Sequence, residues 1–352
     1  MSLLKNSKPA AYIAAFAFLV ASIVVGVSVG SVQVPFLVSA EIIGRTALGL
    51  DFPSHLDTTF VNIIKEIRLP RVLLAVLVGA GLAIAGAAFQ GLLKNPLADP
   101  YTLGVSSGSS LGAVTVLSLG LSIPGLGRFT LPAVSVLFGM ITLLLLLGFV
   151  KAIERSLSTE TIILAGIIFS SFLGSSISLM IALTGNELRQ IISWIMGSVA
   201  MRGWEYVGLI LPFFIVGCLI LLWNAKELNA LVFGEETAKT LGVNTKVRRM
   251  AVLVAASIIT GSAVAVSGTI GFVGLVVPHL TRLIWGPDHR HLLPLSMLIG
   301  GGFLALTDLL ARTIIAPTEL PIGVITAVAG APVFGLLLFQ QRRLTRQIGK
   351  RR

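Results

Sequence analysis

Residues 68–100 have the sequence RLPRVLLAVLVGAGLAIAGAAFQGLLKNPLADP, and this stretch decides the fold. No residue between Arg71 and Lys94 is charged. This uncharged run, 72–93, has the length of about 20 residues that a helix needs to cross the hydrocarbon core of a bilayer. The stretch therefore predicts a transmembrane helix with a positive charge at each end.

The composition of the whole chain agrees with this prediction. The 352 residues are 55% hydrophobic and 12% charged, and the mean hydropathy is +0.97. A soluble protein has about 25% charged residues. A soluble core of this size cannot hide so much apolar surface behind so few charges. The composition also excludes a disordered chain, which has low hydrophobicity. We therefore expect an integral membrane protein.

Charge-free runs recur along the chain. Nine of them have the length of a membrane span or nearly so: 9–40, 72–93, 100–127, 129–150, 161–186, 206–225, 250–281, 292–307 and 320–341. The run 250–281 is too long for one span and contains several glycines and Pro278, so we expect it to form two helices, the first ending near 267 and the second starting near 271. The expected fold is all-α: a polytopic membrane protein with about ten transmembrane helices in a single domain, 1–352.

The positive charges orient these helices. The chain has 26 Lys and Arg against 15 Asp and Glu, a formal net charge of +11. If the N-terminus is cytoplasmic and ten helices alternate, eighteen of the 26 fall on the cytoplasmic side and eight outside, as the positive-inside rule requires. The cytoplasmic set includes Lys5, Arg155 and the tail residues Arg342, Arg343, Arg346, Lys350, Arg351 and Arg352. We therefore expect a multi-pass protein with both termini in the cytoplasm, whose basic clusters contact the lipid bilayer rather than nucleic acid.

Two glycine-rich stretches resemble each other. Gly86-x2-Phe89-x-Gly91-Leu92 precedes Pro96, and Gly268-x3-Phe272-x-Gly274-Leu275 precedes Pro278. In the ten-helix arrangement the two copies run in opposite directions, which predicts two halves of inverted topology. Because glycine is common in membrane helices, a chance similarity is the alternative.

The segment 226–249 is the most informative loop. Its apolar residues form two short stripes, broken at a glycine and ended by another: Leu228, Leu231 and Val232, then Gly234, then Ala238 and Leu241, then Gly242. Such paired short helices indicate either a docking site for a cytoplasmic partner or a segment that lies on the membrane surface. Glu235 and Glu236 favour the start of the second helix through the helix dipole.

Charged residues stand at the outer ends of two predicted helices. Arg68 and Arg71 fall on neighbouring helix faces, where they either anchor the helix at the interface or bind carboxylates of a soluble partner. Asp308 is the only acid well inside an apolar run, and Arg312 lies one turn away. A local ion pair between these two accounts for the acid, and a functional intramembrane acid is the alternative.

The sequence contains no catalytic constellation. Cys218 is the only cysteine, which excludes a disulfide within the chain and a cysteine metal site. For His289 and His291, which are two apart, a loop that caps helix ends is favoured over a pair of metal ligands. The chain has no Walker A pattern and so does not bind ATP by that route. We expect neither enzymatic activity nor a cofactor.

A series of motifs stands in order along the chain. They are Arg68-Leu-Pro-Arg71, Gln90, Asn95-Pro-Leu-Ala98, Leu103-Gly104, Leu231-x2-Gly234-Glu-x2-Ala238-x2-Leu241-Gly242, Gly271-Phe-Val-Gly-Leu-Val-x-Pro-His279-x2-Arg282, Asp288-His-Arg-x-Leu-Leu-Pro294, Glu319-Leu-Pro-Ile-Gly-Val-x-Thr-Ala327 and Gly330-Ala-Pro332. Together they resemble the FecCD-type permease family, the permease subunits of binding-protein-dependent ABC importers for iron-siderophores, haem and vitamin B12. The resemblance covers about residues 65 to 340.

The resemblance implies partners on both sides of a prokaryotic plasma membrane. It implies a dimer, of two copies of this chain or of this chain and a close paralogue, with a translocation path at the dimer axis. Arg68, Arg71 and Arg312 resemble docking points for glutamates of an extracellular or periplasmic substrate-binding protein. The segment 226–247 resembles the coupling helices that enter a cleft of the ATP-binding subunit, with the coupling residues Leu231, Gly234, Glu235, Ala238, Leu241 and Gly242.

The resemblance also implies a cytoplasmic gate. The matching gate or pathway residues are Asn95, Pro96, Leu97, Ser158 and Thr159. Glu160 departs from the small polar residue expected there. The predicted function is thus a permease subunit that moves an iron(III)-siderophore or a related metal chelate, such as haem or a corrinoid, into the cytoplasm, powered by ATP hydrolysis on a separate subunit. The alternatives are an ion-coupled secondary transporter and a non-transporting membrane scaffold or receptor subunit.

Overall fold

The computed structural model describes residues 8–30, 32–154, 158–185 and 187–349. Within these residues every regular element is helical and no strand is present. The α-helices are α2 (Lys8–Ser28), α3 (Phe36–Leu48), α4 (Thr58–Asn62), α5 (Leu69–Leu92), α6 (Val105–Ser118), α7 (Thr130–Ile153), α8 (Thr159–Leu183), α9 (Leu188–Ile195), α10 (Trp204–Trp223), α11 (Ala225–Val232), α12 (Glu235–Thr240), α13 (Thr245–Ser267), α14 (Val273–Trp285), α15 (His289–Thr313) and α16 (Ile322–Gly349). A π-helical segment, η1 (Ile63–Arg68), joins α4 to α5, and two 3-10 turns are η2 (Pro100–Leu103) and η3 (Gly127–Phe129). Lys5, Arg155, Lys350, Arg351 and Arg352, which the charge pattern assigns to the cytoplasm, lie outside the described residues.

The predicted membrane helices are present in the predicted order. Seven helical segments of the described chain are long and apolar enough to cross a membrane: α2, the continuous segment Thr58–Leu92, the segment Gly127–Ile153, α8, α10, α13 and α15. The helix α14 and the apolar part of α16 are shorter, and α6 has 14 residues. The long run 250–281 breaks where predicted, because α13 ends at Ser267 and Gly268 follows with φ +71°, a conformation that favours glycine. The all-α, multi-pass architecture is confirmed, and the inverted relation of its halves stays a prediction.

Two predicted helix boundaries were wrong. The first charge-free run is not one helix, because α2 ends at Ser28 and α3 begins only after Pro35. The helix that contains Arg68 and Arg71 does not begin there. It begins ten residues earlier at Thr58, where the Asp57 carboxylate accepts a hydrogen bond from the Thr59 amide at 2.7 Å. Both arginines therefore lie within a continuous helical segment.

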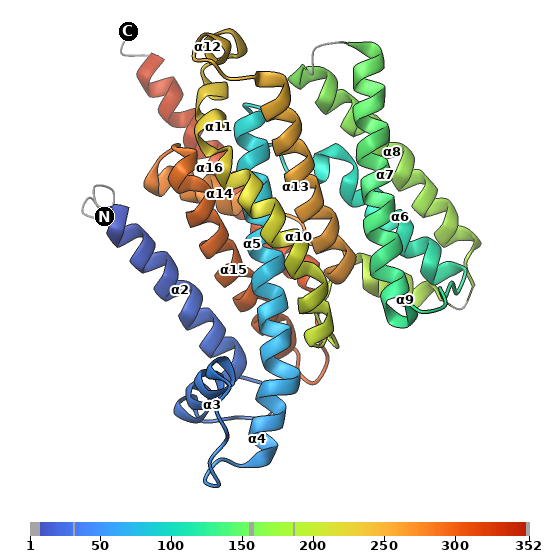
Figure 1. The fold of residues 1–352 in the computed structure, drawn as a ribbon, viewed down its shortest axis with the longest axis vertical. Helices are drawn as coiled ribbons and strands as arrows, with labels where there is room; N and C mark the ends of the chain where they lie inside the picture. The colour runs from blue at the N-terminus through green and yellow to red at the C-terminus, as the bar shows by residue number, and fades with distance from the viewer. Residues whose placement is uncertain (1–7, 31, 155–157, 186, 350–352) are drawn as a thin grey trace.

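The elements distribute between two ends of the molecule (Figure 1). The start of α2, the end of α16 and the pair α11–α12 lie toward one end, and α3 and α4 lie at the opposite end. The start of α2, the end of α16 and the pair α11–α12 therefore lie toward the same end, and that this end faces the cytoplasm stays a prediction. We call the end with α11 and α12 the inner end and the end with α3 and α4 the outer end.

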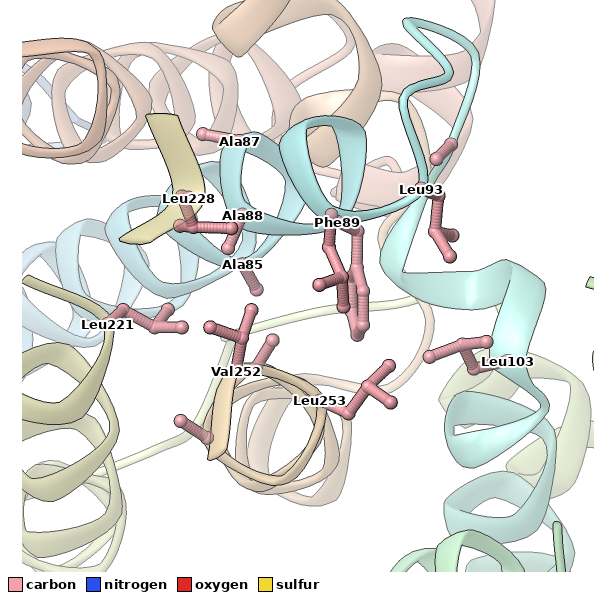
Figure 2. Packing of buried hydrophobic residues seen from close by; sticks show 14 of the residues in the cluster. Ala85, Ala87, Ala88, Phe89, Leu93, Leu103, Leu221, Leu228, Val252 and Leu253 are labelled. Atoms are coloured by element: carbon pink, nitrogen blue, oxygen red, sulfur yellow. The ribbon is translucent and has the colours of Figure 1, made fainter. Parts of the chain in front are cut away.

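The helix α5 forms the centre of the bundle, and most of its length is buried. Small residues permit close contact with its neighbours. A Cβ at Gly86 would overlap the carbonyl oxygen of Gly274 in α14, and one at Gly79 would overlap the carbonyl oxygen of Gly300 in α15. Figure 2 shows Phe89 at the inner end of α5 facing Val252 and Leu253 of α13. This packing holds α5 against α13, α14 and α15.

Candidate functional site

The inner end carries the two short helices that the sequence predicts. The helices α11 and α12 are separated at Gly234, whose φ of +119° turns the chain sharply, and Gly242 ends the segment with φ +81°. Leu228, Leu231 and Ala238 are fully buried in the core. The prediction of two amphipathic helices is confirmed, and its apolar stripe anchors them to the membrane bundle.

Other apolar side chains of this segment point outward. Phe233 is 76% exposed and Leu241 is 67% exposed, and Val232 is half-exposed beside them. The stripe prediction was wrong for Leu241, because α12 ends at Thr240 and Leu241 lies in the turn beyond it, outside the packed face. An apolar patch at the inner end of a membrane protein indicates a contact with another protein or with lipid.

Ion pairs hold this patch in place. The Glu235 carboxylate accepts a hydrogen bond from the Thr245 hydroxyl at 3.1 Å, and the Arg249 guanidinium lies 3.6 Å from it. Partial burial opposes ionisation of Glu235, but the Arg249 charge, with the Thr245 hydrogen bond and Lys239, keeps its pKa below the usual value. Arg248 of α13 lies 3.4 Å from Glu227 of α11. These contacts connect α11 and α12 to α13.

A cavity of about 600 Å³ lies beside Phe233, between the end of α5, the helix α11 and the start of α15. Asn229, on its wall, donates to the Asp288 carboxylate at 2.7 Å and accepts a hydrogen bond from the His289 amide at 2.9 Å. The Asp288 carboxylate caps α15, and its hydrogen bond with Arg290 keeps its pKa below the usual value. The predicted capping role of this loop is confirmed.

The two histidines of this loop have separate partners. His289 contacts Asn229, and His291 lies 3.1 Å from the Tyr12 hydroxyl. Among the residues with described positions, no three His, Cys, Asp or Glu side chains come close enough together to hold a metal ion.

The predicted gate residues lie in two turns. The Asn95 side chain accepts a hydrogen bond from the Leu97 amide at 2.9 Å, which closes the turn after α5 at Pro96, and Leu97 is 44% exposed. Ser158 caps α8 through the Thr161 amide and also donates to Glu154 at 2.7 Å. Thr159 is the first residue of that helix, and Glu160 lies exposed in its first turn, where the helix dipole favours an acid. These contacts establish turn and cap geometry, and gating stays a prediction.

At the outer end, Arg68 is buried, with 5% of its surface exposed. Its guanidinium donates to the carbonyl oxygens of Val27 and Ser28, each at 2.9 Å, and to that of Val32. Carbonyl groups at the end of a helix have no partner within the helix. Arg68 therefore closes the outer end of α2 and holds the chain beyond it.

Arg71 joins three segments. It donates through Nε and Nη2 to Asp308 of α15 at 2.9–3.1 Å, and through Nη1 and Nη2 to Glu319, in the loop before α16, at 2.8 and 3.0 Å. Asp308 is fully buried, whereas the Glu319 side chain is 42% exposed. The hydrogen bond to Arg71 lowers the pKa of Glu319. We call Arg68, Arg71, Asp308, Arg312 and Glu319 the outer charge cluster.

The cluster changes two predictions. Asp308 is paired, but Arg71 is its principal partner, because Arg312 stays 3.7 Å away and donates to the carbonyl oxygen of Gly26. The three arginines are not free at the surface: the side chains of Arg71 and Arg312 are 12% and 8% exposed. Sequence reasoning missed Glu319 as a partner, although an acid in the last outer loop lies on the side where unexplained positive charges gather.

The outward face of α8 has an unusual composition. This helix is the least buried of the candidate membrane spans. Ser171, Ser175 and Ser178 are exposed on one of its faces, at spacings of four and three residues. The Ser178 hydroxyl donates to the carbonyl oxygen of Gly174 at 3.1 Å, and large apolar side chains such as Ile168 are also exposed on α8, so this surface can face either a protein or lipid.

Comparison with known proteins identifies the class to which this arrangement belongs. The model of the FecCD transport family matches residues 18–340, and the chain belongs to this family. It is 58% identical to the uncharacterized ABC transporter permease protein YvrB of Bacillus subtilis over 340 residues, which covers 97% of this chain and 96% of that protein.

Other relatives have named substrates. The chain is 42% identical to the cobalamin import system permease protein BtuC of Halobacterium salinarum, over 78% of this chain and 73% of that one. It is 38% identical to the hemin transport system permease protein HmuU of Yersinia pestis, over 84% and 90%. A solved inward-facing structure of a metal-chelate type ABC transporter matches with a TM-score of 0.80 at 34% identity, over 93% of this chain and 98% of that one.

Proposed function

We propose that this chain is the permease subunit of an ATP-driven importer that moves a metal chelate into the cytoplasm. The observation that carries the proposal is the inner patch of Val232, Phe233 and Leu241, held on two short helices outside the bundle. Membership of the FecCD transport family and the relatives that import cobalamin and hemin support the substrate class.

The inner patch is the proposed site of the ATP-binding subunit. Gly234 and Gly242 set the direction of α12, and buried Leu231 and Ala238 transmit force from it to the bundle. ATP hydrolysis moves the permease only if the ATPase binds its two states with different free energies. The buried Ala238 and the Glu235–Arg249 ion pair connect α12 to the bundle and to α13, so a movement of α12 in one state would be passed to α13.

The outer charge cluster is the proposed docking site of an extracellular or periplasmic substrate-binding protein. Three arginines face two acids there, so the cluster has a surplus positive charge. Arginine binds carboxylates in a bidentate manner, which suits acidic residues of a protein partner.

The serine face of α8 is the proposed contact with a second permease copy and the edge of the path between the two copies. Rocking of the two copies would alternately open the outer and the inner side, with the turns at Leu97 and Ser158 as the inner gate. Both chain termini lie in the cytoplasm of a prokaryotic cell in this proposal, on the side of α12.

Uptake of labelled substrate by a deletion strain tests the proposal. The strain and its complemented form are compared with three probes: an iron(III)-siderophore, haem and cobalamin. We expect loss of uptake for one probe and its return on complementation. Unchanged uptake of all three would contradict the proposal and favour a scaffold, and uptake that persists without any ATPase partner would favour an ion-coupled transporter.

A further inference from the structure

The guanidinium of Arg71 is shared by two carboxylates that differ in solvent exposure. Asp308 holds Nε and Nη2 and has no exposed side-chain surface. Glu319 holds Nη1 and the second hydrogen of Nη2, and it is 42% exposed. One side of the guanidinium is therefore bound to a buried acid, and the other side is bound to an acid in contact with solvent.

The loop that carries Glu319 does not depend on this pair for its position. The Leu320 amide donates to the carbonyl oxygen of Ala311 at 2.8 Å, and the Ile322 amide donates to that of Gly197 at 3.0 Å. These bonds hold the backbone that follows Glu319 against α15 and against the turn at Gly197. The Glu319 side chain can therefore rotate away without unfolding the loop.

The net positive charge of the outer charge cluster favours the binding of another carboxylate in place of Glu319. Arg68 directs its hydrogen bonds to carbonyl oxygens, and Arg312 donates to Gly26, with its Nε left without a hydrogen-bond partner. Departure of the Glu319 carboxylate would increase the surplus positive charge of the cluster. Because the Arg71 side chain is only 12% exposed, its charge is poorly hydrated and attracts another carboxylate.

We propose that Glu319 is an internal substitute for a carboxylate of the docking partner, occupying Arg71 in the free permease and displaced when the partner binds. This inference rests on the proposed docking of a binding protein at the outer end. The partner offers a surface Glu or Asp beside apolar side chains, which fit exposed Ile314 and Ile315 of the same loop. Docking then exchanges one ion pair for another, so the partner binds reversibly without leaving Arg71 unpaired in either state.

The affinity of the partner tests the exchange. The transporter complex is placed in nanodiscs, and the probe is the soluble domain of the substrate-binding protein encoded beside the permease gene. Because Glu319→Gln removes the competitor, we expect the dissociation constant to fall about fivefold, the size of a partly exposed ion pair. The matched control is Glu66→Gln, an exposed acid next to Lys65, which should leave the constant unchanged. An unchanged or larger constant for Glu319→Gln would overturn the exchange.

A second variant separates this inference from the docking proposal. Arg71→Lys keeps a positive charge beside Asp308 but cannot form the bidentate contact that Nη1 and Nη2 of Arg71 make with a second carboxylate, so the partner should bind more weakly. Weaker binding by Arg71→Lys with no gain in Glu319→Gln overturns the exchange and leaves the docking proposal standing. If neither variant changes the dissociation constant, docking at Arg71 itself is wrong. Thermal unfolding of each variant shows that the fold is retained.

Discussion

The inner and outer ends of this permease present opposite surfaces. At the inner end, α11 and α12 bury part of their apolar stripe and leave Phe233 and Leu241 exposed. At the outer end, buried arginines are bound to carboxylates and carbonyl oxygens of the same chain. The inner surface leaves apolar side chains exposed, whereas the outer guanidinium groups are bound within the chain except at the Nε of Arg312. A partner can thus bind the inner end by covering it, but must displace an existing contact at the outer end.

The largest expected effect on stability comes from neutralising Asp308, the buried acid of the outer charge cluster. Asp308→Asn leaves Arg71 and Arg312 without their shared charge, and removing one member of a buried ion pair costs about 3–5 kcal/mol. We expect a clear fall in the thermal unfolding temperature of the detergent-purified protein. The exposed Glu66→Gln variant should unfold as the wild type does. An unchanged midpoint in Asp308→Asn would contradict the structural role of the cluster.

Two leucines at the inner end, one buried and one exposed, should respond differently to substitution by alanine. Leu228→Ala removes a fully buried side chain and should destabilise the fold by about 2–5 kcal/mol. Leu241→Ala removes an exposed one and should change stability by less than about 0.5 kcal/mol, while weakening the ATPase contact. Thermal unfolding and co-purification of the ATPase subunit measure the two effects. Similar destabilisation by both variants would show that Leu241 packs within the chain.

The smallest expected effect concerns Glu235. Its pKa is lowered in the folded protein, so its contribution is present above the unfolded pKa and disappears as the pH falls through the folded one. Since the side chain is 36% exposed, Glu235→Gln should cost only about 0.2–1 kcal/mol at pH 7, and nothing at a pH well below about 4, where the carboxyl group is protonated in both the folded and the unfolded state. Unfolding midpoints of wild type and variant at both pH values check this. A gap that persists at the lower pH would assign the effect to something other than charge.

The positions of the helices could be predicted from the sequence more accurately than the partners of the charged side chains. Uncharged runs of span length fix where helices lie, and glycines with positive φ at 234, 242 and 268 mark breaks that the pattern located. The pattern missed the break after Ser28 and the early start at Thr58, because both depend on side chains that reach across the fold or cap a helix. It paired Asp308 with Arg312, four residues away, since spacing along one helix cannot reveal that Arg71 approaches from α5.

ATP-dependent uptake by reconstituted protein tests the central claim most directly. Proteoliposomes containing the permease, its ATPase and the binding protein are loaded with ATP and given the chelate identified by the deletion strain. We predict uptake by the wild type only with ATP, and none by Leu241→Arg, whose fold should remain intact because this position is exposed. Uptake by the wild type without ATP, or equal uptake by Leu241→Arg, would contradict an importer driven through α12.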